Sequence, residues 1–569
     1  MAYVITDSYL IRTMRRARAL PTIRCCHGKA GARMMSRVRT YNLADLFEIV
    51  ADSVPDRIAF RCGPHQLSYR ELDRRASRLA SALRSRGVER SHNVGIQLHN
   101  SAEYLETFFA CCKIGAAPVN VNYRYVADEL AYLFSSLELR ALVYGEEFED
   151  EVARARSRVP TLSTLLRVGG HERPQGVDNF AEVLASGSEQ LDDPGRSDDD
   201  IYMLCTGGTT GMPKGVMWPH KAIVMAALGG GGIYFGRPPI QSPEELAEFV
   251  PHGPPLAYFA TAPMMHGAAM WASLISLLAG HTVVVNDQPR FDAEHIWDIV
   301  VRDGVNILSI VGDAMALPLI RALEQHPGRW DLSRLITFGN GGAVFSQQLQ
   351  DRLKAVLPNV RISNSMGSSE SGVIGGNDRG SHSGGFMAVE PRPDLAVIDD
   401  QHRFVSAPGA EGTLARTGYT PVGYYGDPVK SAETFVKIDG RVWVITGDRV
   451  RIDEHSQYIV LGRGSICINT GGEKVFPEEV EEAARRCPAV EDVLVVGIPD
   501  ERWGQKVVAV VSVAPGRSFD RAEFDAACRA ALAGYKVPRD VVVCDEIRRS
   551  PAGKADYAWA KRVATEGVA

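Results

Sequence analysis

The sequence predicts an α/β protein with a large N-terminal region built on doubly wound sheets, followed by a small α+β domain. Strand-like and helix-like segments alternate from residue 41 onward, the order that parallel sheets with helical crossovers require. After about residue 464 the pattern changes to apolar strands around one helix, enough for a compact domain of roughly 100 residues. The length of 569 residues exceeds one compact core, so several units are expected.

The first half of the chain shows the alternation most clearly. Asn42 can cap a helix that starts at Leu43. Apolar side chains recur at helical spacing in the segment that follows residue 69, and Gly115 ends a second, mostly apolar helix. The expected segments are strands at 59–60, 67–69, 93–98 and 117–121, and helices at 70–84 and 102–114.

The alternation returns after residue 280, where β-branched runs predict strands. Two Gly-rich stretches, 229–232 and 375–385, have the composition of loops. The expected segments are strands at 282–285, 307–311, 334–338, 493–498, 507–513 and 541–544, and helices at 293–303 and 519–533.

Charge is distributed unevenly along the chain. The formal net charge is −6, but residues 1–40 hold nine basic residues and one acidic residue, so the remaining chain carries −14. An acidic body argues against nucleic acid as the partner. Residues 1–40 have the composition of a targeting arm or of an extended, disordered N-terminus; we favour the latter because no apolar segment follows.

The ten cysteines lack zinc-site spacing, which favours a reducing cytoplasm.

The segment 254–286 contains no Lys, Arg, Asp or Glu. Pro263, His266, Gly267 and Gly280 interrupt it, and the residues between the last two glycines are too few to span a bilayer. The segment therefore predicts a buried helix, and no transmembrane segment is expected.

A glycine- and threonine-rich loop at 206–215 follows an apolar strand. Glycines let backbone N–H groups approach a polyphosphate, hydroxyl groups add donors, and Lys214 adds a positive charge. The spacing is not that of a Walker A loop. The loop therefore predicts nucleotide binding by another architecture.

Eight further motifs follow this loop in order, at 341–343, 366–370, 423–425, 446–448, 461–463, 471–481, 535–538 and 551–554. The ordered set resembles the acyl-adenylate-forming superfamily, which includes acyl-CoA synthetases, luciferases and peptide-synthetase adenylation domains. The resemblance covers roughly residue 41 to the end. The segments 206–218, 462–465, 469–477 and 550–557 look like those of actinobacterial fatty-acid and steroid side-chain CoA ligases.

The resemblance implies an adenylation domain at 41–464 and a small mobile cap at 465–569. It also implies two half-reactions: a carboxylate attacks the α-phosphate of ATP to give an acyl-adenylate and pyrophosphate, and coenzyme A then displaces AMP. Two anions must meet in the first step, so positive charge and Mg²⁺ are expected in a dry cleft. ATP, Mg²⁺ and CoA are thus the expected cofactor and co-substrates.

Three residues match the family's catalytic positions. The resemblance places Lys554 as the lysine that bridges the carboxylate and the nucleotide, and Glu370 as the Mg²⁺ ligand, with Thr206 also at the metal. His266 stands where the family often has a histidine, between the acyl pocket and the adenylate. The full expected ATP/AMP set is Thr206, Gly207, Gly208, Thr209, Thr210, Gly211, Lys214, Gly341, Gly342, Ala343, Met366, Gly367, Ser368, Ser369, Asp448 and Arg463.

The acyl pocket is expected along the helix after His266. Small residues at its mouth suggest room for a bulky or long apolar acid rather than acetate. The expected wall residues are Gly267, Ala268, Trp271 and Gly312, and the expected hinge and CoA residues are Ser465, Gly471 and Gly472.

The chain departs from the family pattern at three positions. Met366 replaces the adenine-stacking aromatic residue, Ser465 replaces the usual Asp or Lys at the hinge, and Asn469 stands where many members carry a lysine.

The favoured function is an acid:CoA ligase for a medium- or long-chain fatty acid or a steroid side-chain acid. The alternatives are an acyl-AMP ligase that delivers to a carrier protein and a non-catalytic nucleotide-binding protein. The oligomeric state is left open, with a homodimer as one alternative.

Overall fold

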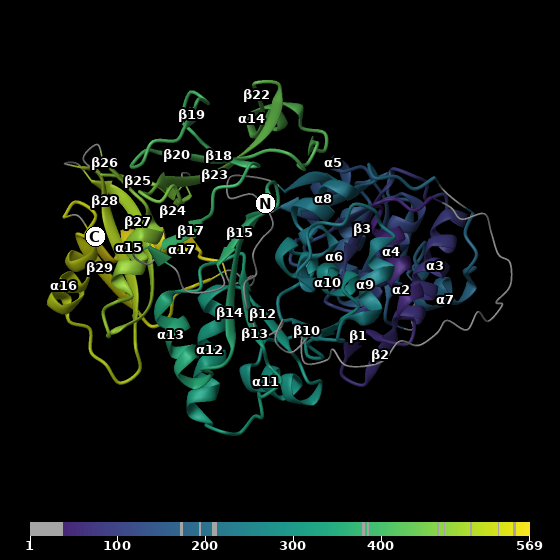
Figure 1. Ribbon diagram of the computed structural model, residues 1–569, viewed down its shortest axis with the longest axis horizontal. Coiled ribbons are helices and arrows are strands. Elements are labelled where there is room, and N and C mark those ends of the chain that lie inside the picture. The colour runs from purple at the N-terminus through teal and green to yellow at the C-terminus, as the bar shows by residue number, and fades with distance from the viewer. Residues whose placement is uncertain are drawn as a thin grey trace, which may run out of the picture.

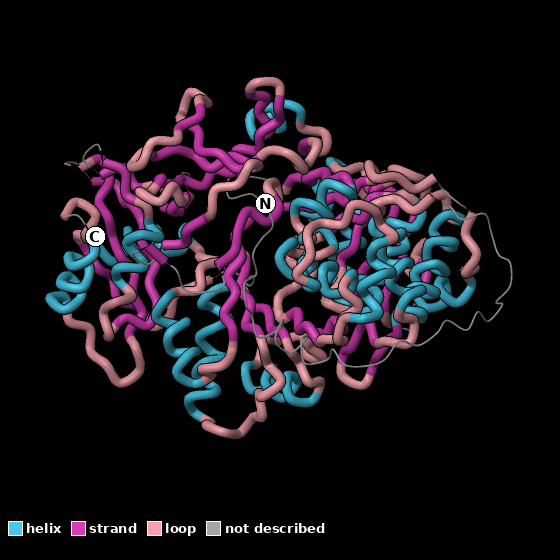
Figure 2. Tube along the Cα trace, in the orientation of Figure 1, coloured by secondary structure: helices cyan, strands magenta, loops and turns pink. Residues whose placement is uncertain are grey.

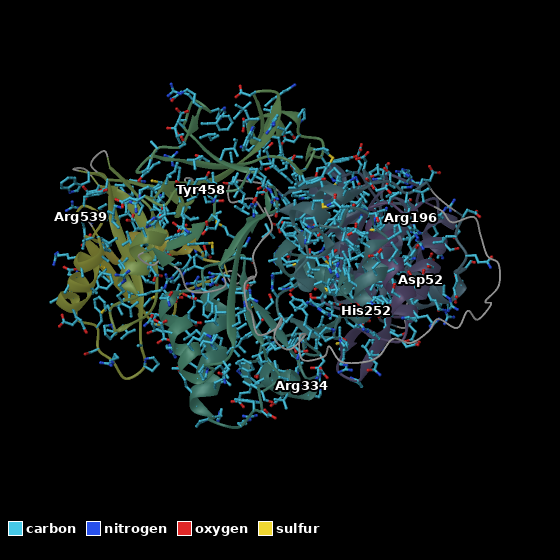
Figure 3. All side chains as sticks on the ribbon, in the orientation of Figure 1. Asp52, Arg196, His252, Arg334, Tyr458 and Arg539 are labelled. Carbon is cyan, nitrogen blue, oxygen red and sulfur yellow. The ribbon has the colours of Figure 1, made fainter. Side chains whose placement is uncertain are left out.

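The computed structural model describes residues 38–170, 174–192, 195–206, 213–377, 382–383, 386–463, 466–470, 473–500, 503–532, 534–549 and 554–568. Its strands form four sheets (Figure 1). Helices surround the strands of the first two sheets, whereas the third sheet carries few of them (Figure 2). Asp52 and Arg196 mark one end of the molecule, and Arg539 marks the C-terminal domain at the other end (Figure 3).

The first sheet is mainly parallel. Its order is β21 (Gly423–Tyr424), β9 (Lys214–Pro219), β8 (Ile201–Thr206), β4 (Ala117–Asn120), β3 (Asn93–Gln97), β5 (Leu139–Gly145), β6 (Thr164–Val168) and β7 (Asp178–Asn179). Strands β8, β4, β3, β5, β6 and β7 pair in parallel, and β9 and β21 add an antiparallel edge.

The second sheet repeats this design. Its order is β15 (Gly372–Asn377), β14 (Arg361–Ser368), β13 (Thr337–Gly341), β12 (Ile307–Ile310), β10 (Ala257–Ala260), β11 (Thr282–Val285), β1 (Ile58–Cys62) and β2 (His65–Ser68). Strands β14 to β1 pair in parallel, and the two edge strands, β15 and β2, are antiparallel.

The third and fourth sheets are mainly antiparallel. The third has the order β16 (His382–Ser383), β17 (Phe386–Val389), β24 (Tyr458–Arg463), β23 (Arg441–Ile452), β20 (Glu411–Arg416), β18 (Leu395–Ile398) and β19 (Phe404–Val405), with β22 (Phe435–Ile438) on β23. The fourth, in the C-terminal domain, has the order β26 (Glu473–Val475), β25 (Ile468–Thr470), β28 (Gly504–Val513) and β27 (Val490–Asp500), with β29 (Asp540–Cys544) parallel to β28.

Two helices begin or end at the residues that the local sequence predicts. Asn42 Oδ1 accepts a 2.8 Å hydrogen bond from the Ala44 N–H at the start of α2, and Gly115 ends α4 with φ +71°. The helices are α2 (Leu43–Ser53), α3 (Tyr69–Ser85), α4 (Ala102–Ile114), α5 (Ala127–Ser136), α6 (Glu149–Arg156), α7 (Phe180–Ser186), α8 (His220–Ala226), α9 (Glu245–Phe249), α10 (Gly267–Leu278), α11 (Ala293–Arg302), α12 (Gly312–Gln325), α13 (Gln347–Val356), α14 (Pro428–Thr434), α15 (Pro477–Ala484), α16 (Arg521–Ala531) and α17 (Tyr557–Val568).

The charge-free segment 254–286 forms β10, α10 and β11, and α10 is largely buried. None of the helices in the described part of the chain combines the length and apolarity needed to cross a bilayer. The prediction of a buried helix is thus confirmed.

Three local predictions were wrong. The strand expected at 334–338 is β13 and runs from Thr337 to Gly341, because Leu332 and Leu335 lie in the turn before it. The stretch 375–385 was expected to be a loop, but β15 extends to Asn377, where its glycines allow close pairing with β14. Tyr69 begins α3 instead of ending a strand, because Ser68 and Glu71 form a capping box.

Candidate functional site

Three of the expected motifs begin at the carboxyl ends of strands in the first and second sheets. Strand β8 ends at Thr206, β13 at Gly341 and β14 at Ser368. In open α/β sheets this edge is where ligands bind. The fold therefore brings motifs from distant parts of the chain to one region.

Asn120, at the end of β4, connects the carboxyl edge of the first sheet to that of the second. Its side-chain amide donates to the Met265 carbonyl at 2.6 Å, in the segment before α10. The same side chain exchanges hydrogen bonds with the backbone of Cys205, with its Oδ1 accepting from the Cys205 N–H at 2.6 Å. One buried amide thus holds the strand before the glycine-rich loop against the segment that carries His266.

The glycine-rich loop is closed at its base by a strand pair. Thr206 lies opposite Lys214 in the antiparallel pairing of β8 and β9. Lys214 Nζ donates to Asp427 Oδ2 at 2.8 Å and lies 5.4 Å from the centre of the Tyr424 ring. The ion pair is about one-third exposed, so it adds little stability and a phosphate group could replace Asp427.

Glu370 is held by strand β21. The Tyr424 hydroxyl donates to Glu370 Oε1 at 3.0 Å, and the neighbouring Ser369 carbonyl accepts from the Trp218 indole N–H at 2.8 Å. Burial and the nearby Glu370 carboxylate raise the pKa of Tyr424 well above its usual range, so this hydroxyl keeps its proton. Glu370 is therefore oriented by a neutral donor that leaves its second oxygen available.

The described residues fit a metal ion that arrives with a nucleotide. They contain no group of three or more His, Cys, Asp or Glu side chains that could hold a metal on their own. Mg²⁺ is commonly held by one or two carboxylates together with substrate phosphates. Glu370, half-buried directly after β14 and hydrogen-bonded to Tyr424, is a carboxylate of the kind required.

The turn after β13 is organised by Asn340. Its Oδ1 accepts from the Gly312 N–H at 2.7 Å, and its Nδ2 donates to the Ala343 carbonyl at 3.0 Å. Gly342 is exposed and has φ +89°, a conformation that favours glycine. Asn340 thus fixes the start of α12 against the expected nucleotide turn.

The expected acyl-pocket residues differ in accessibility. Ala268 is exposed and faces the turn, since a Cβ on Gly342 would lie 3.7 Å from the Ala268 Cβ. Trp271 is buried at 6% exposure and lies edge-on to Trp218, with ring centres 6.5 Å apart. A Cβ on Gly267 would come 3.3 Å from the Trp271 ring, so Gly267 permits this close packing.

Other expected nucleotide residues lie on β14 and in the third sheet. Met366 is half-buried against the core of the third sheet, and a bulge separates it from Gly367. Ser368 exchanges hydrogen bonds with Ser371, including one of 3.0 Å between the hydroxyls. Asp448, 6% exposed on β23, pairs across the sheet with Arg463 on β24.

Lys554, near the C-terminal end of the chain, acts electrostatically on His266, which immediately precedes α10. Burial of the imidazole, followed by the charges of Lys554 and Arg124, lowers the pKa of His266 to about 4. Lys554 itself is exposed. The charge of Lys554, in the C-terminal domain, therefore reaches His266 in the segment before α10.

Several expected site residues lie outside the described part of the chain. They belong to the outer part of the glycine-rich loop, to the hinge and to the glycine pair, and the side chains of Arg463 and Asn469 are likewise not described. The residues concerned are Gly207, Gly208, Thr209, Thr210, Gly211, Ser465, Gly471 and Gly472.

Sequence reasoning missed Asn120, Asn340 and Trp218, all of which position site segments. The two asparagines each end or nearly end a strand at the carboxyl edge of a sheet. A polar amide at that place is the signal that could have identified them. Trp218 lies on β9, directly after the glycine-rich loop, and its buried N–H needed an acceptor.

Comparison with family models agrees with these motifs. The model described as AMP-binding enzyme matches residues 47–425, and the model described as AMP-binding enzyme C-terminal domain matches residues 479–554. Together they span the glycine-rich loop, the turn after β13 and Lys554.

The chain is also similar to curated and solved proteins. It is 42% identical to a medium/long-chain-fatty-acid–CoA/3-oxocholest-4-en-26-oate–CoA ligase of Mycobacterium tuberculosis, over 91% of this chain and 95% of the relative. It is 41% identical to a 3-oxocholest-4-en-26-oate–CoA ligase of Rhodococcus rhodochrous, over 91% and 95%. The ATP-bound crystal structure of MatB from Rhodopseudomonas palustris matches with a TM-score of 0.76 at 25% identity, over 91% of this chain and 98% of that one.

Proposed function

This chain belongs to the AMP-binding enzyme family, and from that membership we propose that it is an ATP-dependent acid:CoA ligase that works through an acyl-adenylate. The observation that carries the proposal is the 42% identity, over 91% of the chain, to a CoA ligase of fatty acids and a steroid side-chain acid. The electrostatic influence of Lys554 on His266, and the position of Glu370 directly after β14, support it.

In the first half-reaction, a carboxylate oxygen of the acid attacks the α-phosphorus of ATP. The bond from that phosphorus to the bridging oxygen breaks, and pyrophosphate leaves with its electrons. Lys554 offsets the negative charge where the two anions meet. Lys214 leaves its ion pair with Asp427 and binds the departing pyrophosphate instead. Asp448 accepts hydrogen bonds from the ribose hydroxyls, and Arg463 lies beside it on the neighbouring strand.

In the second half-reaction, the thiolate of CoA attacks the acyl carbonyl and AMP leaves. The C-terminal domain turns about Ser465, so that Lys554 withdraws and the segment around Gly471 and Gly472 approaches the cleft. Glu370 would hold the Mg²⁺ that accompanies ATP, with Thr206 beside the phosphates; the ion lowers the repulsion between the acid and the triphosphate.

The acid is a medium- or long-chain fatty acid or a steroid side-chain acid. The two curated relatives act on such acids by their names. Ala268 leaves the exposed end of α10 small, next to Gly342, where a long apolar acid needs space. The protein is expected to act in the cytoplasm and to bind no nucleic acid, and a homodimer is one alternative for its oligomeric state.

A substrate panel tests the proposal. Purified protein with Mg²⁺, ATP and CoA is assayed for AMP release with acetate, octanoate, palmitate, an aromatic acid and a steroid side-chain acid. We expect the highest kcat/KM for the long or steroid acids. Higher kcat/KM for acetate than for octanoate would contradict the substrate class. Absence of pyrophosphate exchange into ATP with every acid would contradict the ligase itself.

The acceptor is tested separately. The thioester step is run with CoA and, in parallel, with a phosphopantetheinyl carrier protein. The curated relatives are CoA ligases, so CoA is expected to react faster. Faster reaction with the carrier would support an acyl-AMP ligase instead.

A further inference from the structure

An ion pair connects the two domains at the beginning of α12. Arg485, directly after α15 in the C-terminal domain, has its Nε 3.5 Å from Asp313 Oδ2 in the first turn of α12. The side chains are only 5% and 6% exposed. Buried charges of this kind are tolerated only when each has a partner, so the pair depends on the orientation of the domains.

On the C-terminal side, the pair continues to the segment that carries Lys554. Arg485 Nη2 lies 3.6 Å from Asp492 Oδ1 on β27. Arg549 donates two hydrogen bonds to the same carboxylate, at 2.9 and 2.8 Å. Arg549 also pairs with Ala555 in an isolated antiparallel bridge, which closes the base of the segment that contains Lys554.

On the N-terminal side, Asp313 is fixed to the turn that follows β13. Its Oδ1 accepts from the Ser346 N–H at 2.8 Å, and its own N–H donates to the Val344 carbonyl at 3.0 Å. The preceding residue, Gly312, donates to Asn340. Asp313 is therefore attached to the same turn as Gly341 and Gly342, on the expected nucleotide side of the cleft.

Five charged side chains form a chain of contacts from this turn to Arg549, whose backbone pairs with Ala555, the residue after Lys554. We name it the interdomain ion chain, and its members are Asp313, Arg485, Glu481, Asp492 and Arg549. Within the C-terminal domain, Arg485 keeps Glu481 and Asp492 in any orientation, because all three lie on α15 and β27 or between them. Among these five side chains, Asp313 is the member that lies on the other side of the interface. Its contact with Arg485 is thus the orientation-dependent member of the chain. A separate interdomain pair joins Arg321 on α12 to Glu491 on β27 at 2.6 Å.

We propose that Asp313 and Arg485 are positioning residues that hold the C-terminal domain, and with it Lys554, in register for adenylation. The inference rests on the proposed function, because it concerns the adenylation half-reaction. Loss of the Asp313 charge destabilises the domain orientation in which acyl-adenylate forms. It does not affect the orientation in which the thioester forms. The chemistry at Lys554 is unchanged. What changes is the fraction of molecules in which the C-terminal domain places Lys554 at the site of adenylation.

Asp313→Asn is the informative variant. An asparagine Oδ1 can still accept from the Ser346 N–H, so the turn keeps its hydrogen bond while the charge on Arg485 loses its partner in the other domain. Arg485 is buried among its own domain's carboxylates, so its removal could unfold that domain and is not used as the main test. The matched control is Asp540→Asn, which breaks an ion pair with Lys506 of 2.8 Å away from the interface.

The half-reactions are measured separately with an octanoate or palmitate substrate. In Asp313→Asn we expect pyrophosphate exchange to fall by about tenfold to 100-fold in kcat, with KM for ATP nearly unchanged. Thioester formation from supplied acyl-adenylate and CoA stays within about twofold. Asp540→Asn leaves both rates at the wild-type value. An equal loss in both half-reactions, or no loss in either, would overturn the inference.

A measurement without substrates separates this inference from the proposed function. Hydrogen–deuterium exchange is compared for the first turn of α12 and for α15 in the wild type, Asp313→Asn and Asp540→Asn. We expect faster exchange at both segments only in Asp313→Asn. Unchanged exchange would overturn the interdomain role even if the ligase activity is established, and a wild type inactive with every acid would contradict the proposed function instead.

Discussion

Lys554 acts on His266: burial of the imidazole, followed by the charges of Lys554 and Arg124, lowers the pKa of His266 to about 4. One residue lies next to the C-terminal helix α17, and the other immediately precedes α10. The relationship means that the lysine is presented to the cleft while the histidine is neutral at physiological pH. A neutral imidazole beside a cationic lysine leaves the positive charge on Lys554 for the two anionic substrates.

Replacing Lys554 by Ala is expected to lower pyrophosphate exchange by at least about 100-fold, because the charge that offsets two approaching anions is lost. Thioester formation from supplied acyl-adenylate should remain close to that of the wild type. Both rates are measured on the same preparation, with Lys561→Ala, an exposed lysine on α17, as the matched control. An equal loss of rate in the two half-reactions would contradict a role of Lys554 in adenylation alone.

Low pH is expected to destabilise the domain orientation for adenylation, because it protonates His266. The imidazole has a pKa of about 4 in this orientation and about 6.5 when hydrated, so this orientation binds fewer protons between those values. The stabilising contribution of neutral His266 is therefore complete above about pH 6.5 and is lost as pH falls toward 4. Pyrophosphate exchange should show an acid limb in this range that His266→Asn reduces.

The pKa itself can be measured by NMR titration of labelled histidine, with the His266 signal assigned by its loss in His266→Asn. We expect a value near 4 in the wild type and a higher value, between 4 and 6.5, in Lys554→Ala. An identical titration in the two proteins would show that Lys554 does not reach the imidazole.

The sequence predicts well what short segments determine. Asn42 and Gly115 predicted the ends of two helices because capping depends on neighbouring residues alone. The alternation of apolar runs predicted the parallel sheets for the same reason. The antiparallel third sheet was not predicted, because its strands are separated by turns of variable length and carry no helical spacing that marks a crossover.

The candidate site shows the same limit. Its motif residues are consecutive and could be predicted, but the groups that position them come from distant segments. Asn120 contacts Met265, and Asp313 contacts Arg485, across separations that no local pattern encodes. The hydrogen-bond partner of Glu370, Tyr424, belongs to a motif that the sequence identified without indicating this contact.

Gly312 is expected to resist substitution for a structural reason. Its φ is +62°, and a Cβ there would lie 2.7 Å from the Val344 carbonyl oxygen, a backbone atom that cannot move aside easily. Gly312→Ala should lower the free energy of unfolding by about 1–3 kcal/mol. Gly409→Ala is the matched control, since φ is +81° there but a Cβ would have no atom within 4 Å. Thermal unfolding compares them, and an equal shift in both would contradict the role of the close contact.

Ala268 provides the sharpest test of the acyl side of the cleft. Its methyl group is exposed, and it lies 3.7 Å from where a Cβ on Gly342 would be. A phenylalanine at this position would occupy the space between α10 and the turn after β13, where we propose that a long acid passes. Ala268→Phe should therefore raise KM for palmitate or a steroid acid by about tenfold or more, and change KM for acetate or butyrate by less than about twofold.

Ala247→Phe, on the exposed face of α9, controls for the added aromatic surface and should leave every KM unchanged. Steady-state AMP release with a series of acids of increasing length gives the profile for each variant. If Ala268→Phe raises KM equally for short and long acids, the ring obstructs the nucleotide and the acyl chain runs elsewhere. A rise confined to long acids places the chain between Ala268 and Gly342, because only that route makes the penalty depend on length.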